Sequence, residues 1–162
     1  MRSSSTVLVL LLTIASLAVA DFSAGLSAYK KGDYTTALKE WRPLADQGDP
    51  AVQYNLGLMY LDGQGVPQDY TEAVKWFRRA ADQDYTQAQH NLGAMYGVGH
   101  GVKRDYVQAY KWLNVCAAKG NAGCVSQRDQ VAKKLKASQL QEAQRLSSQF
   151  SPKKESDGSS HQ

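Results

Sequence analysis

The chain repeats itself at a fixed interval of 36 residues, and this interval constrains its fold more than any other feature. The segment Asn-Leu-Gly-x-Met-Tyr at 55–60 returns at 91–96, and Gly-x-Gly-Val at 63–66 returns at 99–102. Asp-Tyr-x-x-Ala stands at 33–37, 69–73 and 105–109. A period of this length predicts an array of stacked units, each too small to bury its apolar face alone.

Each unit is predicted to be a pair of helices. Asp49 followed by Pro50 is typical of a helix start, because the aspartate caps the first turn and proline needs no partner there. The glycine-rich stretch 62–66 ends that helix. Asp69 with Glu72 has the spacing of a capping pair for the second helix, and Asp105 stands at the same position one period later.

At this point the sequence resembles a known family. The pattern Leu-Gly-x-x-Tyr-x-x-Gly-x-Gly-Val-x-x-Asp-x-x-x-Ala-x-x-Trp-x-x-x-x-Ala spans 56–81 and recurs over 92–117. It is similar to the Sel-one-like repeat, a relative of the tetratricopeptide repeat, and the resemblance covers about residues 22–136. The resemblance implies an all-α fold: an α/α solenoid, wound as a right-handed superhelix of antiparallel helix pairs. We expect about three to four repeats and a C-terminal capping helix.

The repeat register divides the chain into segments. We expect an N-terminal degenerate, tetratricopeptide-like repeat at 21–48, Sel-one-like repeats at 49–84 and 85–120, and a C-terminal degenerate repeat with a capping helix at 121–150. Ser138 and Gln141 have the Ser-x-x-Gln spacing of a cap for that last helix. Residues 151–162 carry no large apolar side chain, so we expect a disordered tail there.

The first twenty residues have the pattern of a secretory signal. One arginine precedes an uncharged apolar run at 7–20, which ends in the small-x-small motif Ala18-Val19-Ala20. A helix of this length covers about 21 Å, less than the roughly 30 Å hydrocarbon core of a membrane. We therefore expect cleavage after Ala20, no membrane span in the mature chain, and a periplasmic or secreted location.

The chain has two cysteines, Cys116 and Cys124, on either side of the turn Lys119-Gly120-Asn121 between two units. That turn would bring the end of one helix beside the start of the next, and a disulfide is the natural state of such a pair in an exported chain. Two reduced buried thiols are the alternative. The eight-residue spacing across a unit boundary also resembles cysteine-rich members of this repeat family, which implies the bond.

Several motifs could suggest catalysis, and each has a simpler interpretation. Ser27 with Lys30 and Ser151 with Lys154 match Ser-x-x-Lys, the pattern of serine β-lactamases and penicillin-binding proteins, an assignment that some cysteine-rich relatives carry. Ser-Asp-Asn and Lys-Thr-Gly are absent, which favours chance matches. A β-lactam- or cell-wall-directed hydrolase or penicillin-binding protein is therefore the alternative function, and an enzyme is not our first expectation.

Metal and nucleic acid are not expected as ligands. His90 and His100 have no carboxylate or cysteine at metal-ligand spacing, so we expect no metal and no cofactor. Lys and Arg number 19 against 15 Asp and Glu, a modest excess that gathers at 128–145. In an exported protein such an excess indicates first a solvated basic helix face and second an acidic partner or an anionic envelope surface, and we expect no nucleic acid.

The remaining candidate is a binding surface. In related helical repeats the first helix of each unit lines a concave groove that holds peptides or protein segments. Carried over by the period, the predicted groove residues are Tyr29, Lys30, Tyr54, Leu58, Leu61, Asp62, His90, Ala94, Val98, Ser126, Gln130, Lys133 and Lys134. The competing interpretation places some of them, Tyr54 and Leu58 first, in the core.

These observations predict an exported, non-enzymatic protein–protein interaction scaffold. The groove runs from an apolar stretch at 54–61 to a basic C-terminal end, which suits a protein or peptide partner with apolar anchors and an acidic end. A second alternative is an adaptor that binds envelope polysaccharide.

Overall fold

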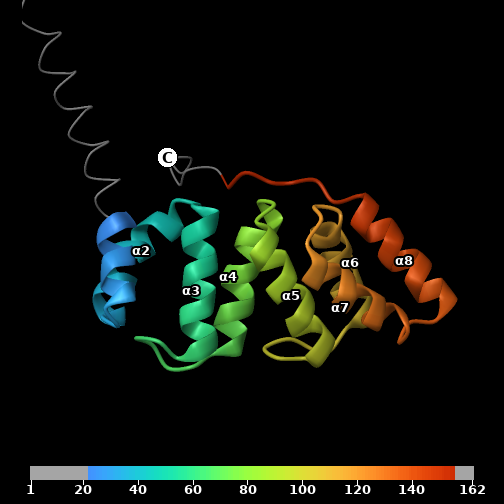
Figure 1. The fold of residues 1–162 in the computed structure, drawn as a ribbon, viewed down its shortest axis with the longest axis horizontal. Helices are drawn as coiled ribbons and strands as arrows, with labels where there is room; N and C mark the ends of the chain where they lie inside the picture. The colour runs from blue at the N-terminus through green and yellow to red at the C-terminus, as the bar shows by residue number, and fades with distance from the viewer. Residues whose placement is uncertain (1–21, 156–162) are drawn as a thin grey trace, which may run out of the picture.

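The computed structural model describes residues 22–155, and every regular element in that range is a helix (Figure 1). The segment expected to be a signal, residues 1–20, lies outside the described part of the chain. A helix over residues 22–30 is followed by α2 (Tyr34–Asp46), α3 (Pro50–Asp62), α4 (Tyr70–Asp82), α5 (Thr86–Val98), α6 (Tyr106–Ala117), α7 (Ala122–Ala132) and α8 (Ala137–Ser148). Within 22–155, no helix combines the length and apolar character needed to cross a bilayer.

The helices form a row from α2 at one end to α8 at the other, and each helix from α2 to α6 packs on the next (Figure 1). The strongest contacts lie within the pairs α3–α4 and α5–α6, which are the two complete copies of the repeat. At the C-terminal end α8 packs on α6, so it closes the row as a cap. The all-α repeat solenoid expected from the sequence is confirmed.

Local signals set the ends of the helices where the sequence predicts them. The Asp49, Asp69 and Asp105 side chains each accept two backbone N–H hydrogen bonds from the first turn that follows. Gly63 and Gly99 end α3 and α5 in the left-handed conformation, with φ of 69° and 82°. The aspartate cap at the helix start and the left-handed glycine at the helix end therefore recur one period apart.

Two of the expected caps differ in detail. The Glu72 carboxylate does not reach back to complete the cap of α4 and pairs instead with Lys75, at 2.5 Å. The helix α8 begins before Ser138, because Gln139 accepts a hydrogen bond of 3.0 Å from the backbone N–H of Lys136. Ser138 therefore lies inside the first turn and does not cap it.

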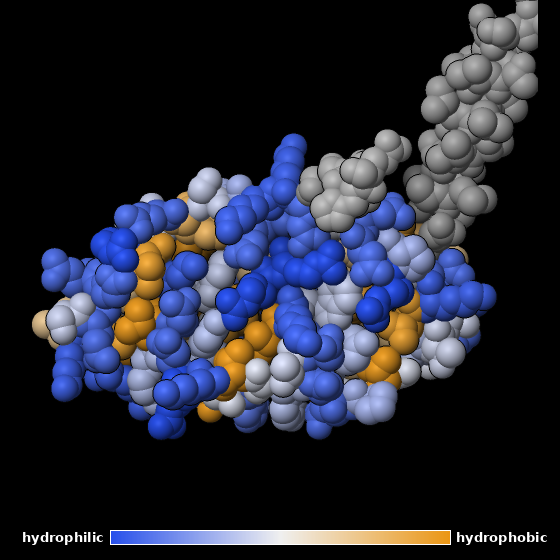
Figure 2. All heavy atoms as spheres, turned by 180° about the vertical axis from the view of Figure 1, so that it is seen from behind, coloured by the Kyte–Doolittle hydropathy of each residue, from blue (hydrophilic) through white to orange (hydrophobic). Residues whose placement is uncertain are grey.

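The core is a series of three clusters along the row. The first contains Trp41, Leu56, Met59 and Trp76, the second Phe77, Leu92, Met95 and Trp112, and the third Leu113, Cys116 and Cys124. Figure 2 shows hydrophobic residues as narrow strips between hydrophilic ones on the face that it presents. Apolar side chains are therefore spread along a stack, as a solenoid requires.

Glycines let the paired helices approach closely. A Cβ atom on Gly57 would lie 2.5 Å from the Phe77 ring, and one on Gly93 would lie 2.7 Å from the Leu113 side chain. Both glycines are buried and stand at the same position of the repeat. The contact between first and second helix therefore depends on the missing side chain.

Residues 151–155, the described part of the expected tail, are in contact with the helices. Residues 151–155 run back over the helix ends in an extended form (Figure 1). The Lys153 N–H donates to the Asp82 carbonyl at 2.8 Å, and Glu155 pairs with Arg79. This differs from a disordered tail over 151–155, because polar partners on α4 replace the apolar contacts that this segment lacks. Residues 156–162 lie outside the described part.

Candidate functional site

Three of the predicted groove residues of α3 are half-buried and pack on the core. Tyr54, Leu58 and Leu61 all lie against the second core cluster. The Tyr54 ring stands 5.7 Å from Phe77 and 5.3 Å from Tyr85, centroid to centroid. Burial and the nearby Tyr85 raise the pKa of the Tyr54 hydroxyl, so it stays protonated. These side chains offer a partner only their outer edges.

At the N-terminal end, Tyr29 belongs to an aromatic group. Its hydroxyl donates to Gln64 at 2.8 Å, and its ring lies 5.3 Å from Tyr34 and 5.5 Å from Trp41. Burial, Tyr34 and Asp62 together raise the pKa of Tyr29. The predicted residues Lys30 and Asp62 are exposed beside this group.

Four predicted groove residues line one cleft between α5, α6 and α7. Ala94 and Val98 come from α5, Gln130 from α7, and Lys134 from the turn after it. The cleft has a volume of about 280 Å³ and is completed by Gly93, Gly97, Tyr106, Leu113, Gln127 and Val131. Val98 is 60% exposed and is the one large hydrophobic side chain so exposed between residues 22 and 155. We call this the apolar cleft.

The other predicted residues do not join that cleft. His90 is half-buried, its Nε2 atom has no hydrogen-bond partner, and its ring lies near Gly123 at the start of α7. Ser126 and Lys133 are exposed on or just after α7, outside the cleft.

A larger basic cleft adjoins the apolar cleft, and the sequence reasoning missed it. It has a volume of about 790 Å³ and is lined by Arg78, Tyr96, Val102, Lys103, Arg104, Asp105, Tyr106, Val107, Gln108, Lys134, Leu135 and Gln139. Four of these are cationic, and the one carboxylate, Asp105, is engaged in capping α6. Tyr106 and Lys134 line both clefts, so the two form one surface.

Aromatic rings hold the cations of the basic cleft. Arg78 donates to the Tyr96 hydroxyl, and its guanidinium carbon lies 5.6 Å from that ring. Arg104 lies 5.6 Å and Lys134 5.9 Å from the Tyr106 ring. A signal was present in the sequence: the pair Lys103-Arg104 stands where the preceding repeat has Pro67-Gln68. Such a surface can bind carboxylates beside an apolar anchor.

The motifs considered for catalysis lie apart from both clefts. Ser27 and Lys30 are exposed on the helix over 22–30, and Ser151 is exposed in the extended tail. Across residues 22–155, no three His, Cys, Asp or Glu side chains cluster as a metal site. His100 stacks on Tyr70 with ring centroids 4.9 Å apart.

The two cysteines meet at the start of α7. Cys116 and Cys124 are both buried and lie at disulfide distance, with Cα atoms 5.9 Å apart. The turn between them carries Gly120 with a positive φ of 81°. The chain reversal there brings the end of α6 beside the start of α7.

Comparison with known proteins agrees with this architecture. The family model for the Sel1 repeat matches residues 50–85 and 86–121. A protective antigen of uropathogenic Escherichia coli strains, described as displaying an SLR fold, superposes with a TM-score of 0.77 and 37% identity over 82% of this chain and 29% of that chain. A Sel1 repeat protein from Oxalobacter formigenes superposes with a TM-score of 0.64 and 34% identity over 69% of this chain and 34% of that chain.

The chain thus spans 29% and 34% of the lengths of these two solved proteins. No curated protein matches it. Two matched repeats and two solved relatives of the same architecture identify the family: the chain belongs to the Sel1-like repeat proteins.

Proposed function

We propose that this Sel1-like repeat protein is an exported, non-enzymatic scaffold that binds an extended segment of a partner protein. The segment places an apolar side chain in the apolar cleft and acidic side chains in the basic cleft. The main observation in support of the proposal is that Tyr106 and Lys134 line both clefts.

The chemistry of the two clefts supports this partner. The exposed Val98 and the small residues Ala94 and Gly97 leave room for a side chain beside α5. The cations around Tyr106 suit carboxylates, since a charge-assisted hydrogen bond is stronger than a neutral one. A rigid stack of helices keeps both features in register, which lowers the entropy lost on binding.

Selection of peptides from a random library on the purified mature chain tests the proposal. We expect enriched peptides to combine an aromatic or aliphatic residue with nearby Asp or Glu. The variant Lys134→Glu should weaken their binding by about tenfold or more, because it reverses a charge inside both clefts. The matched control Lys39→Glu reverses an exposed charge on α2 and should keep the affinity. Equal loss in both variants, or no enriched peptides, would contradict the proposal.

Export and the absence of catalysis are separate parts of the proposal. Residues 1–20 support export by their signal pattern, and the first residue of the processed protein should be Asp21 when sequenced from the N-terminus. A β-lactam hydrolase would turn over nitrocefin and lose that activity in Ser27→Ala. Such a result would replace the scaffold by the enzyme.

A further inference from the structure

The points where successive units meet contain a polar arrangement that repeats with the 36-residue period. We call the group Ala45, Gly48, Gln53, Arg79 and Gln83 the first joint, and the group Ala81, Asp84, Gln89 and Lys119 the second joint. A fully buried glutamine lies at the centre of each. Its Nε2 donates to a carbonyl of the preceding helix, from Gln53 to Ala45 at 3.0 Å and from Gln89 to Ala81 at 3.3 Å.

A second donor in each joint comes from the turn that follows α4 or α6. Gln83 donates to the Gly48 carbonyl at 2.8 Å and to the buried glutamine of the first joint at 2.9 Å. Lys119, one period later, donates to the Asp84 carbonyl at 2.7 Å and to the buried glutamine of the second joint at 3.3 Å. The backbone conformation also recurs, with φ of 102° at Gly48 and 72° at Asp84.

The two joints differ at one chemical group. In the second joint the Asp84 carboxylate accepts hydrogen bonds from Gln89, at 3.0 Å, and from Lys119. In the first joint the equivalent residue is Gly48, which has no side chain. The first joint therefore has the donors of this arrangement and no carboxylate of its own at that position.

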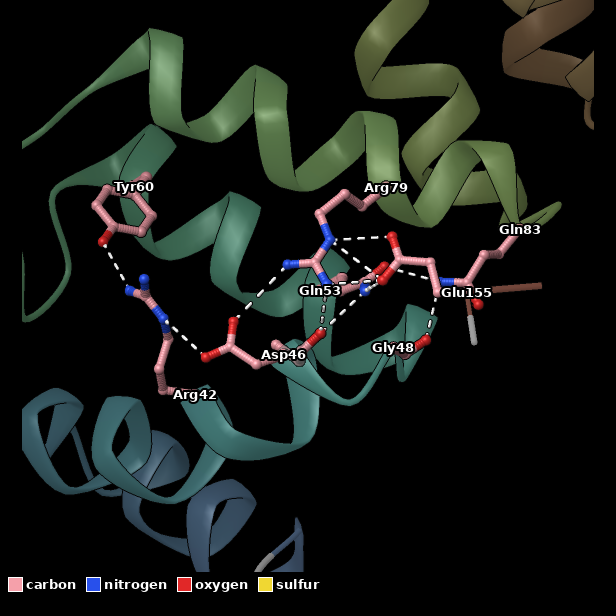
Figure 3. A network of polar contacts seen from close by, with 9 residues as sticks. Arg42, Asp46, Gly48, Gln53, Tyr60, Arg79, Gln83 and Glu155 are labelled. Carbon is pink, nitrogen blue, oxygen red and sulfur yellow. Dashed lines mark hydrogen bonds and ion pairs between the residues drawn. The ribbon is translucent and has the colours of Figure 1, made fainter. Parts of the chain in front are cut away.

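The tail supplies the missing group. The Glu155 carboxylate accepts from Gln53 at 2.8 Å and from two nitrogens of Arg79, Nε at 2.9 Å and Nη2 at 2.6 Å (Figure 3). A Cβ atom on Gly48 would lie 3.0 Å from the Cβ of Glu155, so Glu155 occupies space that the glycine leaves open. Figure 3 shows the Glu155 carboxylate between Arg79 and Gln53, with Gly48 beside it.

Contacts other than Glu155 hold Arg79 in place. Its guanidinium lies 4.6 Å from the Trp76 ring, its Nη2 donates to the Ala45 carbonyl at 3.1 Å, and its Nη1 lies 3.8 Å from Asp46. Gln53 is likewise held by Gln83. The donors therefore keep their positions without a carboxylate, and a preorganised site binds more tightly.

We propose that the first joint is a carboxylate-binding site for a glutamate in an extended peptide segment, built from Gly48, Gln53 and Arg79. Its occupant in the free protein is the chain's own Glu155, in the segment Ser151-Pro152-Lys153-Lys154-Glu155. When this residue is absent, the site binds the same segment offered as a separate molecule. The site lies apart from the two clefts, so it does not depend on the proposed function.

The test uses the full mature chain and a labelled peptide with the sequence of residues 150–156. The peptide should bind the Glu155→Gln protein. Binding to the wild type should be about tenfold weaker or more, because the tethered tail occupies the site at an effective concentration in the millimolar range. A peptide with Gln in place of Glu should lose about tenfold in affinity for the Glu155→Gln protein, since it cannot pair with Arg79.

Two further variants, both made in the Glu155→Gln background, separate binding from folding. Arg79→Met should abolish peptide binding, whereas Lys75→Met, one helical turn away and exposed, should keep it. Gly48→Asp should block the site from within, as Asp84 does in the second joint. Because a φ of 102° strains any residue that carries a side chain, thermal unfolding is measured to check that this variant is folded. Equal affinity for the Glu and Gln peptides would overturn the proposal. Unchanged binding after Gly48→Asp would also overturn it, as would no binding up to about 5 mM peptide, a concentration comparable to the effective concentration of the tethered tail.

Discussion

The two joints lower the pKa of the carboxyl groups that they hold, Glu155 in the first joint and Asp84 in the second. A hydrogen bond from Arg79 lowers the pKa of Glu155, and partial burial acts in the opposite direction without cancelling it. Burial would raise the pKa of Asp84, but hydrogen bonds from Lys119 and Gln89 outweigh it and leave the pKa lowered. Both joints therefore favour an ionised carboxylate.

The lowered pKa of Glu155 predicts a dependence of stability on pH. A carboxyl group whose pKa is lower in the folded state stabilises the fold above its ordinary value of 4.5, and this contribution disappears as the pH falls through the folded-state pKa. At about pH 7 the wild type should exceed Glu155→Gln by about 1 kcal/mol in the free energy of unfolding, a value reduced by partial exposure of the pair.

Urea unfolding at about pH 7 and about pH 3 measures this difference, which should be smaller at the lower pH because Glu155 becomes protonated as the pH falls. The charged groups that face Glu155 are Arg79 and, through it, Asp46. Glu142→Gln removes an exposed carboxylate paired with Arg145 on α8, so it should change little at either pH. A difference between wild type and Glu155→Gln that is as large at the lower pH as at the higher one would contradict the assignment.

At the scale of helices, the contact between α5 and α6 depends on which glycine faces the partner. A Cβ atom on Gly93 would lie 2.7 Å from the Leu113 side chain and 3.3 Å from the Ala109 carbonyl oxygen. One turn later, a Cβ atom on Gly97 would meet only the Ala109 Cβ, at 3.9 Å. The same helix thus carries one glycine required by packing and one that packing does not require.

These two glycines predict opposite effects of the same substitution. Gly93→Ala should lower the free energy of unfolding by about 1–3 kcal/mol, because α6 must move or Leu113 must leave its rotamer. Gly97→Ala should raise it by about 0.5–1 kcal/mol, since alanine is the better helix former and meets ordinary van der Waals distance. Chemical denaturation of both variants and the wild type measures the effects, and a stabilising Gly93→Ala would refute the close approach.

The sequence predicts the helices better than the site, because the contacts that end helices join residues close together in the chain and those of the site join residues far apart. Asp69 bonds to the backbone two and three residues later, so its role is visible in a short segment. The contact between Glu155 and Arg79 joins residues 76 positions apart, and no local pattern indicates it. Lys103 and Arg104 also meet Lys134 only after α6 and α7 have folded into place.

For the molecule as a whole, burial decreases toward the C-terminal end. The helices α4, α5 and α6 each bury six or seven residues, whereas α7 buries only Cys124 and α8 buries Ala143 and Ser147. In a linear array, each unit is stabilised by its neighbours, so end units open first. Cys124, which contacts Cys116, is therefore the one buried residue by which α7 is anchored to α6, beside the half-buried Val125 and Val131.

Reduction of the protein should loosen this end without unfolding the rest. A disulfide across eight residues contributes at most about 2.5 kcal/mol through loop entropy, less than the stability expected for a domain. We expect hydrogen exchange in Ala122–Ala132 to accelerate after reduction, while exchange in Pro50–Asp82 stays unchanged. Mass spectrometry of exchange measures both. The Cys116→Ser/Cys124→Ser variant should not respond to reductant, and two free thiols in the native protein would contradict the bond.

The extended tail has a consequence for how the array could grow. Five residues reach at most about 17 Å, so the tail that begins after α8 reaches only a limited distance along the row. Insertion of one more 36-residue unit before α7 would move the start of the tail away by one unit. Glu155 would then meet a joint that already contains an aspartate, and Gly48 would face solvent. The contact between Glu155 and the first joint thus fits only the present number of repeats. After a duplication, a longer tail would be needed to restore this contact, or a residue with a carboxylate at position 48 to replace it.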